Sequence, residues 1–271
     1  MKVNIANHEY TIQWDGVYYF ALSDYPNISD WELRKLVYFM QYEKLNGRNI
    51  QIICDDDSIM SAVNNALAHP ETVLQAQKPA KITECTACKQ KGCLTESVCH
   101  TASIESAKLI LACGKILSAV NARNMSGADL VKENRNATGD PADYFEYLMM
   151  SWGNCQSGDR LVMERMLSRE PNKEDLSTGL MPGVRFYFKY DTIITHPNYV
   201  FDGYHPAKIK DELVLTDYLF ACIIPEQYKS KFEKLIPANI ASKVYYIKND
   251  CKDIWDWSEK VYKFIENNHA K

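Results

Sequence analysis

Three side chains stand at positions in the chain that suit the handling of an anionic ligand. His100 ends a short apolar segment, and Arg135 closes the polar run that follows Gly114. Glu212 stands directly before the apolar run LVLTDYLFACII. Imidazole and guanidinium groups form hydrogen bonds with phosphate, and a carboxylate at the start of a strand is well placed for catalysis. The alternative interpretation of Glu212 is a charge that keeps a strand edge soluble.

The elements that must position these side chains are a strand, a short helix and a loop. A strand is expected to deliver His100 and Thr101. Ser103 is a typical N-cap residue, and Gly114 is typical of a left-handed C-terminal cap, so a helix is predicted between them. Apolar residues fall on one face of this helix at helical spacing: Ile104, Ala107, Ile110 and Leu111.

The segment 184–190 alternates cleanly and predicts a second strand. One face carries Val184, Phe186 and Phe188, and the other carries Arg185, Tyr187 and Lys189. Farther along, 140–152 is interpreted as a helix that Trp152-Gly153 breaks, and the segment 159–168 as a second helix. The stretch THPNYVFDGYHPAKIKDE (195–212) is interpreted as a long irregular loop.

The order His-Thr, helix, Gly and a loop ending in Arg resembles the opening of the ADP-ribosyltransferase fold, and most closely its DNA-modifying, DarT-like branch. GVRFYFK (183–189) resembles the middle strand of that branch. KDELVLTDYLFACIIP (210–225) resembles its segment with a catalytic glutamate followed by a strand. The resemblance covers roughly residues 98–250, and the order and spacing of the three pieces carry it.

The resemblance implies an α+β fold, with an ADP-ribosyltransferase-like mixed or antiparallel sheet core and a smaller N-terminal α/β unit. It implies a glycosyltransferase that releases nicotinamide from NAD and passes ADP-ribose to an acceptor. The implied acceptor is a nucleobase in single-stranded DNA, while RNA or protein remains open. A toxin or defence effector, with a partner antidote protein, is the implied biological setting.

The resemblance also implies residue roles. Glu212 would stabilise the positive charge that forms on the ribose, and Arg135 would bind phosphate or assist proton movement at the acceptor. His100 and Thr101 would position NAD by hydrogen bonds, and Tyr187 or Phe188 would stack on nicotinamide. For Arg135 the alternative is a solvated basic residue, and for the two aromatic residues it is ordinary sheet packing.

Four of the nine cysteines cluster within fifteen positions: Cys85, Cys88, Cys93 and Cys99. Four thiolates at this spacing can surround one tetrahedral zinc ion, which we favour over an iron–sulfur cluster. Cys99 poses a conflict, because a residue entering the strand of His100 can point into the core. His100 replacing Cys99 as a ligand, and a reduced linker with no metal, are the alternatives.

Two rival functions follow from these features. One is a non-enzymatic, metal-stabilised nucleic-acid-binding protein that uses the loop lysines Lys208 and Lys210 as phosphate contacts. The other is a zinc or iron–sulfur enzyme centred on the cysteine cluster. The first predicts salt-sensitive binding without NAD turnover, and the second predicts activity that follows metal occupancy.

The composition of the chain and its breaks between segments limit the possible domain organisation and partners. With 271 residues, 46% of them hydrophobic, the chain can bury a sizeable core, and its net charge of −4 restricts any nucleic-acid contact to a local basic face. We expect an N-terminal α/β accessory domain (1–75), a linker with the cysteine cluster (76–98) and the transferase-like domain (99–271). A hairpin between 3–5 and 10–14 is expected in the first part. Asp55-Asp56-Asp57 is interpreted as a helix cap, with a metal or ligand site at the end of the preceding strand as the alternative. The absence of a signal-like or membrane-length apolar run predicts a cytoplasmic protein.

Overall fold

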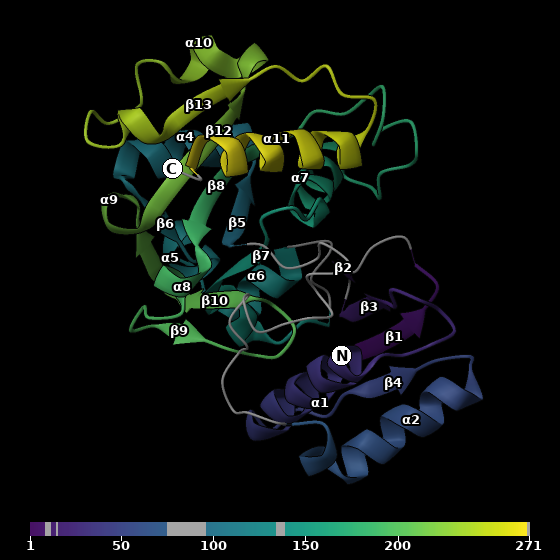
Figure 1. Ribbon diagram of the computed structural model, residues 1–271. Helices are drawn as coiled ribbons and strands as arrows, with labels where there is room; N and C mark the ends of the chain where they lie inside the picture. Colours follow the sequence, from purple (N-terminus) through teal and green to yellow (C-terminus); the bar gives the residue numbers. More distant parts are fainter. Residues whose placement is uncertain (9–11, 15, 75–95, 134–138, 270–271) are drawn as a thin grey trace.

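The fold is given by a computed structural model, which describes residues 1–8, 12–14, 16–74, 96–133 and 139–269 (Figure 1). Within these ranges the chain has a mixed α+β architecture with a four-stranded sheet, a seven-stranded sheet and a two-stranded ladder. The four-stranded sheet belongs to the N-terminal part of the chain. The other two belong to the part that starts at Ser97.

The N-terminal sheet has the order β2-β3-β1-β4, with β1 at Lys2–Ala6, β2 at Ile12–Trp14, β3 at Val17–Ala21 and β4 at Gln51–Ile53. β1 runs parallel to both β3 and β4, and β2 pairs antiparallel with β3. The expected hairpin between 3–5 and 10–14 is therefore wrong. Gly16, at φ 72°, provides a left-handed turn just before β3, and this turn makes β3 the hairpin partner of β2.

Two helices complete the N-terminal unit, α1 (Asp30–Leu45) and α2 (Asp57–Ala68). α1 begins with a capping box in which the Glu32 carboxylate accepts from the Ser29 backbone N–H at 2.9 Å. α2 begins at Asp56, whose carboxylate accepts from the backbone N–H groups of Ser58 and Ile59 at 2.9 Å each. The acidic triplet therefore caps a helix, as its sequence predicts.

The larger sheet has the strand order β13-β12-β8-β5-β7-β10-β9. Its β12–β13 pair is parallel, and its other pairs are antiparallel. The strands are β5 (Ser97–Ala102), β7 (Tyr147–Trp152), β8 (Val184–Lys189), β9 (Tyr199–Val200), β10 (Ala207–Lys210), β12 (Leu219–Pro225) and β13 (Val244–Ile247). β8 confirms the strand predicted from alternation.

The helix expected over 140–152 is wrong. A short 3₁₀ segment, Ala142–Glu146, leads directly into β7, which pairs with both β5 and β10. The apolar run YLMMSW fits either a helix or a strand by pattern alone, and two flanking strand partners decide the outcome. Likewise, the stretch 195–212 is not wholly irregular, because β9 and β10 form within it.

Helices cover both faces of the larger sheet (Figure 1). On one face α4 (Ile104–Cys113) shares a core cluster with Phe186 and Phe188 of β8. On the other face α7 (Ser157–Leu167) and α11 (Ile254–His269) share a cluster with Tyr187 and Ile223. The connecting helices are α5 (Ala119–Arg123), α6 (Gly127–Glu133), α8 (Tyr190–Ile193), α9 (Leu215–Tyr218) and α10 (Lys229–Phe232).

A buried ion pair joins α7 and α11 to the sheet. Arg185 of β8 donates to the Asp159 carboxylate through Nε at 2.7 Å and Nη2 at 2.5 Å, and both side chains are fully buried. Its Nη2 also donates to the Ser258 hydroxyl of α11, and its Nη1 donates to the Tyr187 hydroxyl at 3.1 Å. Asp159 accepts a further hydrogen bond from the Gly183 backbone N–H at 2.8 Å. The network satisfies the buried charges and fixes three elements relative to one another.

A second buried charge joins the N-terminal unit to the larger sheet. Lys208 of β10 is fully buried, and its Nζ lies 4.5 to 4.8 Å from the ring centres of Tyr42, Tyr144 and Tyr147. It also lies 3.4 Å from the Asp202 carboxylate. Tyr42 belongs to α1, so this cation–π contact crosses between the two parts of the chain. Lys208 is therefore not the surface phosphate contact that the sequence suggested.

No helix in the described part of the chain is long and apolar enough to cross a membrane.

The buried pair yields a test of stability. Asp159→Asn removes the partner of a fully buried guanidinium and should lower the free energy of unfolding by about 3–5 kcal/mol. Urea denaturation measures the change. Asp175→Asn removes the partner of the exposed Arg169 in a geometrically similar pair and should have little effect. An equally small decrease in the free energy of unfolding in both variants would contradict a central role for the buried pair.

Candidate active site

The strand–helix–glycine unit predicted from the sequence is present. Ser103 caps α4, and its hydroxyl accepts from the Ser106 backbone N–H at 3.2 Å. Gly114 ends the helix at φ 72° and donates its N–H to the Ile110 carbonyl at 2.9 Å. The left-handed conformation suits glycine and turns the chain into β6 (Lys115–Leu117).

β6 pairs antiparallel with β11 (Glu212–Val214), and this ladder fixes the position of Glu212. In the register Glu212 lies opposite Leu117. Two backbone hydrogen bonds extend the contact, from Leu215 N–H to the Gly114 carbonyl at 2.9 Å and from Ser118 N–H to the Asp211 carbonyl at 2.7 Å. The segment that carries Glu212 is thus bound to the segment that follows α4, almost a hundred residues earlier in the chain.

The Glu212 carboxylate accepts a hydrogen bond from Lys115 Nζ at 2.7 Å, and 43% of its side chain is exposed. This hydrogen bond with Glu212 raises the pKa of Lys115. The carboxylate is accessible to a ligand and forms an ion pair with a cationic neighbour. Sequence reasoning missed Lys115. Its place directly after the glycine cap gave no signal of a partner in a distant strand.

His100 lies where the larger sheet opens. The ladder between β5 and β7 contains two residue pairs in the described chain, Val98 with Trp152 and Cys99 with Ser151. Beyond Cys99, β5 stays paired with β8, while β7 pairs with β10. The sheet therefore divides into two parts at His100.

The His100 ring bridges the division. Its Nδ1 lies 3.3 Å from the Met149 carbonyl oxygen of β7. A carbonyl oxygen only accepts hydrogen bonds, so Nδ1 carries the proton in this contact. Burial lowers the pKa of His100, so the imidazole is neutral at pH 7 and Nε2 has a lone pair to offer.

Backbone pairing connects His100 to Glu212. Met149 pairs with Lys208 on β10, and Lys208 precedes Glu212 by four residues, a span of at most about 13 Å of extended chain. His100 also shares its strand face with Val98 and Ala102, which belong to the same core cluster as Ile116 of β6. Leu213 and Ile116 point into this cluster, so the Glu212 side chain lies with Lys115 on the outer face of the β6–β11 ladder.

One arginine adds positive charge near His100. The charge of Arg165, on α7, contributes to the lowered pKa of His100. The charged neighbours of Arg165 are Glu164, on the same helix, and Arg123 of α5, which pairs with Glu133 at 3.6 Å. The Arg165 side chain is exposed, and its guanidinium forms no hydrogen bond or ion pair with any residue that the structure describes. Sequence reasoning did not single out Arg165, because only the fold shows its proximity to His100.

Three predicted ligand contacts lie in packed surroundings. Thr101 points to the face opposite His100, where its side chain packs against Gly158 and Gly183. Tyr187 is fully buried, and its hydroxyl donates to the Gly153 carbonyl at 3.1 Å. Phe188 is fully buried in the core cluster under α4. The structure does not bring these three side chains to a surface where they would meet a ligand.

The remaining predicted site residues are Arg135, Cys85, Cys88 and Cys93, and they lie outside the described residues. Cys99 lies in the core beside Tyr187 and Met163, and burial raises the pKa of its thiol to about 12. A buried, protonated thiol is a poor zinc ligand. No group of three or more His, Cys, Asp or Glu side chains among the described residues is arranged to hold a metal ion. The four-thiolate site stays a prediction.

Comparison of the chain with family models, curated proteins and solved structures finds no match.

The neutral state of His100 predicts a pH dependence of stability. Its folded-state pKa lies below the value of about 6.5 of the unfolded chain. As pH falls below about 6.5, the unfolded chain binds a proton that folded His100 does not, so stability is lost. Denaturant unfolding across this range should show a smaller loss for His100→Asn than for the parent protein. The exposed-site control His69→Asn should keep the parental slope, and an unchanged slope in His100→Asn would contradict the assignment.

Proposed function

We propose that the chain is an NAD-dependent ADP-ribosyltransferase that modifies a base in single-stranded nucleic acid, with DNA as the favoured acceptor. The observation that carries the proposal is the pairing of β11 with β6. This pairing attaches Glu212 to the unit formed by β5, α4 and Gly114, which are the pieces whose order resembles the DarT-like branch. The division of the sheet at His100 gives a second line of support.

The proposed reaction breaks the glycosidic bond between nicotinamide and ribose. Positive charge develops on the ribose as this bond lengthens. Glu212 would face that charge, and its ion pair with Lys115 holds the carboxylate in position. Lys115 acts through Glu212 and is thus a positioning residue rather than a catalytic one.

Binding of NAD would use the groups around His100. The neutral Nε2 atom is suited to accept a hydrogen bond from a ribose hydroxyl. The guanidinium group of Arg165 would face the pyrophosphate. Arg135 keeps its proposed role at phosphate or at the acceptor, and Thr101 would act by supporting the strand that carries His100.

A single-stranded base is the acceptor best suited to such a site. An unpaired base reaches a pocket without the cost of leaving a duplex. The overall charge of −4 restricts strand contact to local basic groups, and Arg165 would provide one. The role of a toxin or defence effector with an antidote partner remains part of this proposal.

A binding experiment distinguishes the nucleic-acid-binding alternative from the transferase. The alternative requires salt-sensitive binding to DNA or RNA with no consumption of NAD. Of its two proposed phosphate contacts, Lys208 is fully buried and Lys210 pairs with Glu146 at 3.1 Å. The observations therefore favour the transferase.

The transferase proposal predicts the effect of Glu212→Gln. Incubation with labelled NAD and single-stranded DNA, RNA or cell extract should transfer label with the parent protein. The substitution keeps size and hydrogen bonding but removes the charge, so transfer should fall by about a hundredfold or more. Glu226→Gln, at an exposed position after β12, is the matched control and should retain activity. Undiminished transfer by Glu212→Gln, with intact folding, would reject the proposal.

A separate prediction concerns Arg165. Loss of one charged hydrogen-bond donor to the pyrophosphate should raise the KM for NAD about tenfold in Arg165→Ala, with a smaller change in kcat. Arg165→Lys should recover part of the loss because it restores the charge. Arg169→Ala, near the end of the same helix, should leave the KM unchanged. A parental KM in Arg165→Ala would remove this residue from the NAD site.

A further inference from the structure

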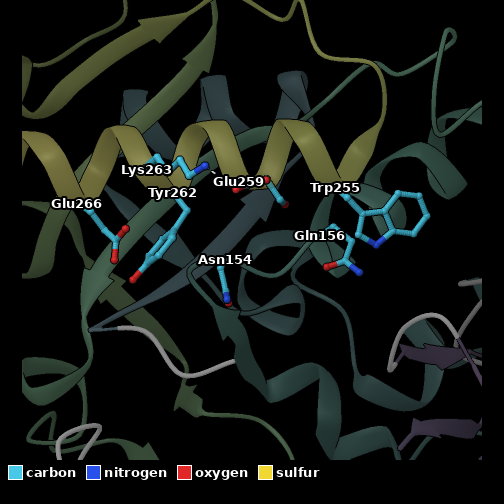
Figure 2. Close-up of a pocket in the computed structure, with 8 residues that line it drawn as sticks. Asn154, Gln156, Trp255, Glu259, Tyr262, Lys263 and Glu266 are labelled. Atoms are coloured by element: carbon cyan, nitrogen blue, oxygen red, sulfur yellow. Dashed lines mark ion pairs between the residues drawn. The ribbon is translucent and has the colours of Figure 1, made fainter. Parts of the chain in front are cut away.

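A cavity of about 260 Å³ lies between α11 and the turn that connects β7 to α7. Asn154 and Gln156 line it from the turn (Figure 2). One stripe of α11 lines the other wall, at spacings of three and four residues: Trp255, Ser258, Glu259, Tyr262, Lys263 and Glu266. This wall belongs to the sheet face opposite α4, so the cavity is separate from the site at His100 and Glu212.

α11 presents two different stripes. Its buried stripe, Ile254, Trp257, Val261 and Ile265, packs in the core under the helix. Trp255 does not join that core, and the residue remains 39% exposed. A large aromatic ring at the edge of a cavity is a typical anchor for a planar ligand.

Hydrogen bonds fix the α11 wall of the cavity in place. Ser258 is buried, and its hydroxyl accepts from Arg185, which is held by Asp159. The cavity wall on α11 is thus tied to the sheet and to the start of α7. A preformed wall lowers the ordering cost of binding a small ligand.

The polar groups of the lining indicate the kind of ligand. The Gln156 amide offers donors and an acceptor, and its side chain has no hydrogen-bond partner among the described residues. Lys263 pairs with Glu259 at 2.5 Å, which leaves Glu266 as the unbalanced charge of the lining. A net negative lining disfavours phosphate and favours a neutral ring.

The volume of the cavity narrows the class of ligand further. Pockets for drug-sized ligands span about 300 to 1,000 Å³, so this cavity is small for a dinucleotide. Figure 2 shows Trp255 near Gln156 at one end of the cavity and Tyr262 near Glu266 at the other. An aromatic surface for stacking with an amide beside it matches the requirements of a nucleobase, because amides pair with base edges and rings stack on base faces.

We propose that this cavity binds a neutral nucleobase, presented either by a free nucleoside or by an unpaired base of a nucleic acid strand. The base stacks on Trp255, and its hydrogen-bonding edge meets Gln156. The proposal needs no NAD and no transfer chemistry, so it stands or falls separately from the transferase proposal.

The test is isothermal titration of the full chain, without NAD, with the four deoxynucleosides, their 5′-monophosphates and a short single-stranded oligonucleotide. At least one nucleoside should bind saturably, and its monophosphate should bind more weakly because of the acidic lining. Trp255→Ala should weaken binding about tenfold through the loss of stacking. Gln156→Ala, a change in a surface turn, should weaken it as well.

Leu109→Ala is the matched control, because it removes an exposed apolar side chain from α4, on the other face of the sheet. It should bind as the parent protein does. Stronger binding of the oligonucleotide than of any nucleoside, lost in Trp255→Ala, would identify the strand as the source of the base. Failure of every nucleoside and of the oligonucleotide to bind, or parental binding by both Trp255→Ala and Gln156→Ala, would overturn the proposal.

Discussion

The buried ion pair between Arg185 and Asp159 sets the positions of the elements on which both proposed sites depend. Asp159 lies in the first turn of α7 and Ser258 lies on α11, and Arg185 on β8 contacts both. Because α7 is fixed at this end, its last turn holds Arg165 beside His100. Because α11 is fixed through Ser258, its outer stripe forms a stable cavity wall. A buried charge pair is costly to desolvate, and here the cost is offset by several hydrogen bonds that specify one arrangement.

The N-terminal unit is integrated with the rest of the chain by similar physics. The Asp202 carboxyl is fully buried, which alone would raise its pKa. The charge and hydrogen bond of His205, together with Lys208, hold the pKa of Asp202 well below its usual range. Lys208 lies on β10, the strand that leads to Glu212, and α1 contributes one ring of its tyrosine surroundings. Arg48 extends the contact by pairing with both Glu43 and Asp143. The unit thus supports β10, the strand that precedes the proposed catalytic glutamate.

Local signals in the sequence predicted the local structure well. Ser103 and Gly114 marked the ends of α4 because capping depends on the residues themselves. The segment 147–152 was misread because a short apolar run satisfies helix and strand patterns equally, and its strand partners lie far away in the chain. Lys208 was misread as a surface lysine because its tyrosine and aspartate partners come from three separate stretches of the chain. Lys115 and Glu212 pair because the topology makes their strands neighbours. The spacing of residues along the sequence does not reveal such a pair.

The central claim is that His100, Arg165 and Glu212 act on one bound NAD molecule. A crystal structure of the full chain with a non-hydrolysable NAD analogue tests it most directly. The account predicts the nicotinamide ribose between the His100 ring and the Glu212 carboxylate, with the pyrophosphate facing Arg165. An analogue bound elsewhere in the molecule, with these three side chains free of contact, would contradict it.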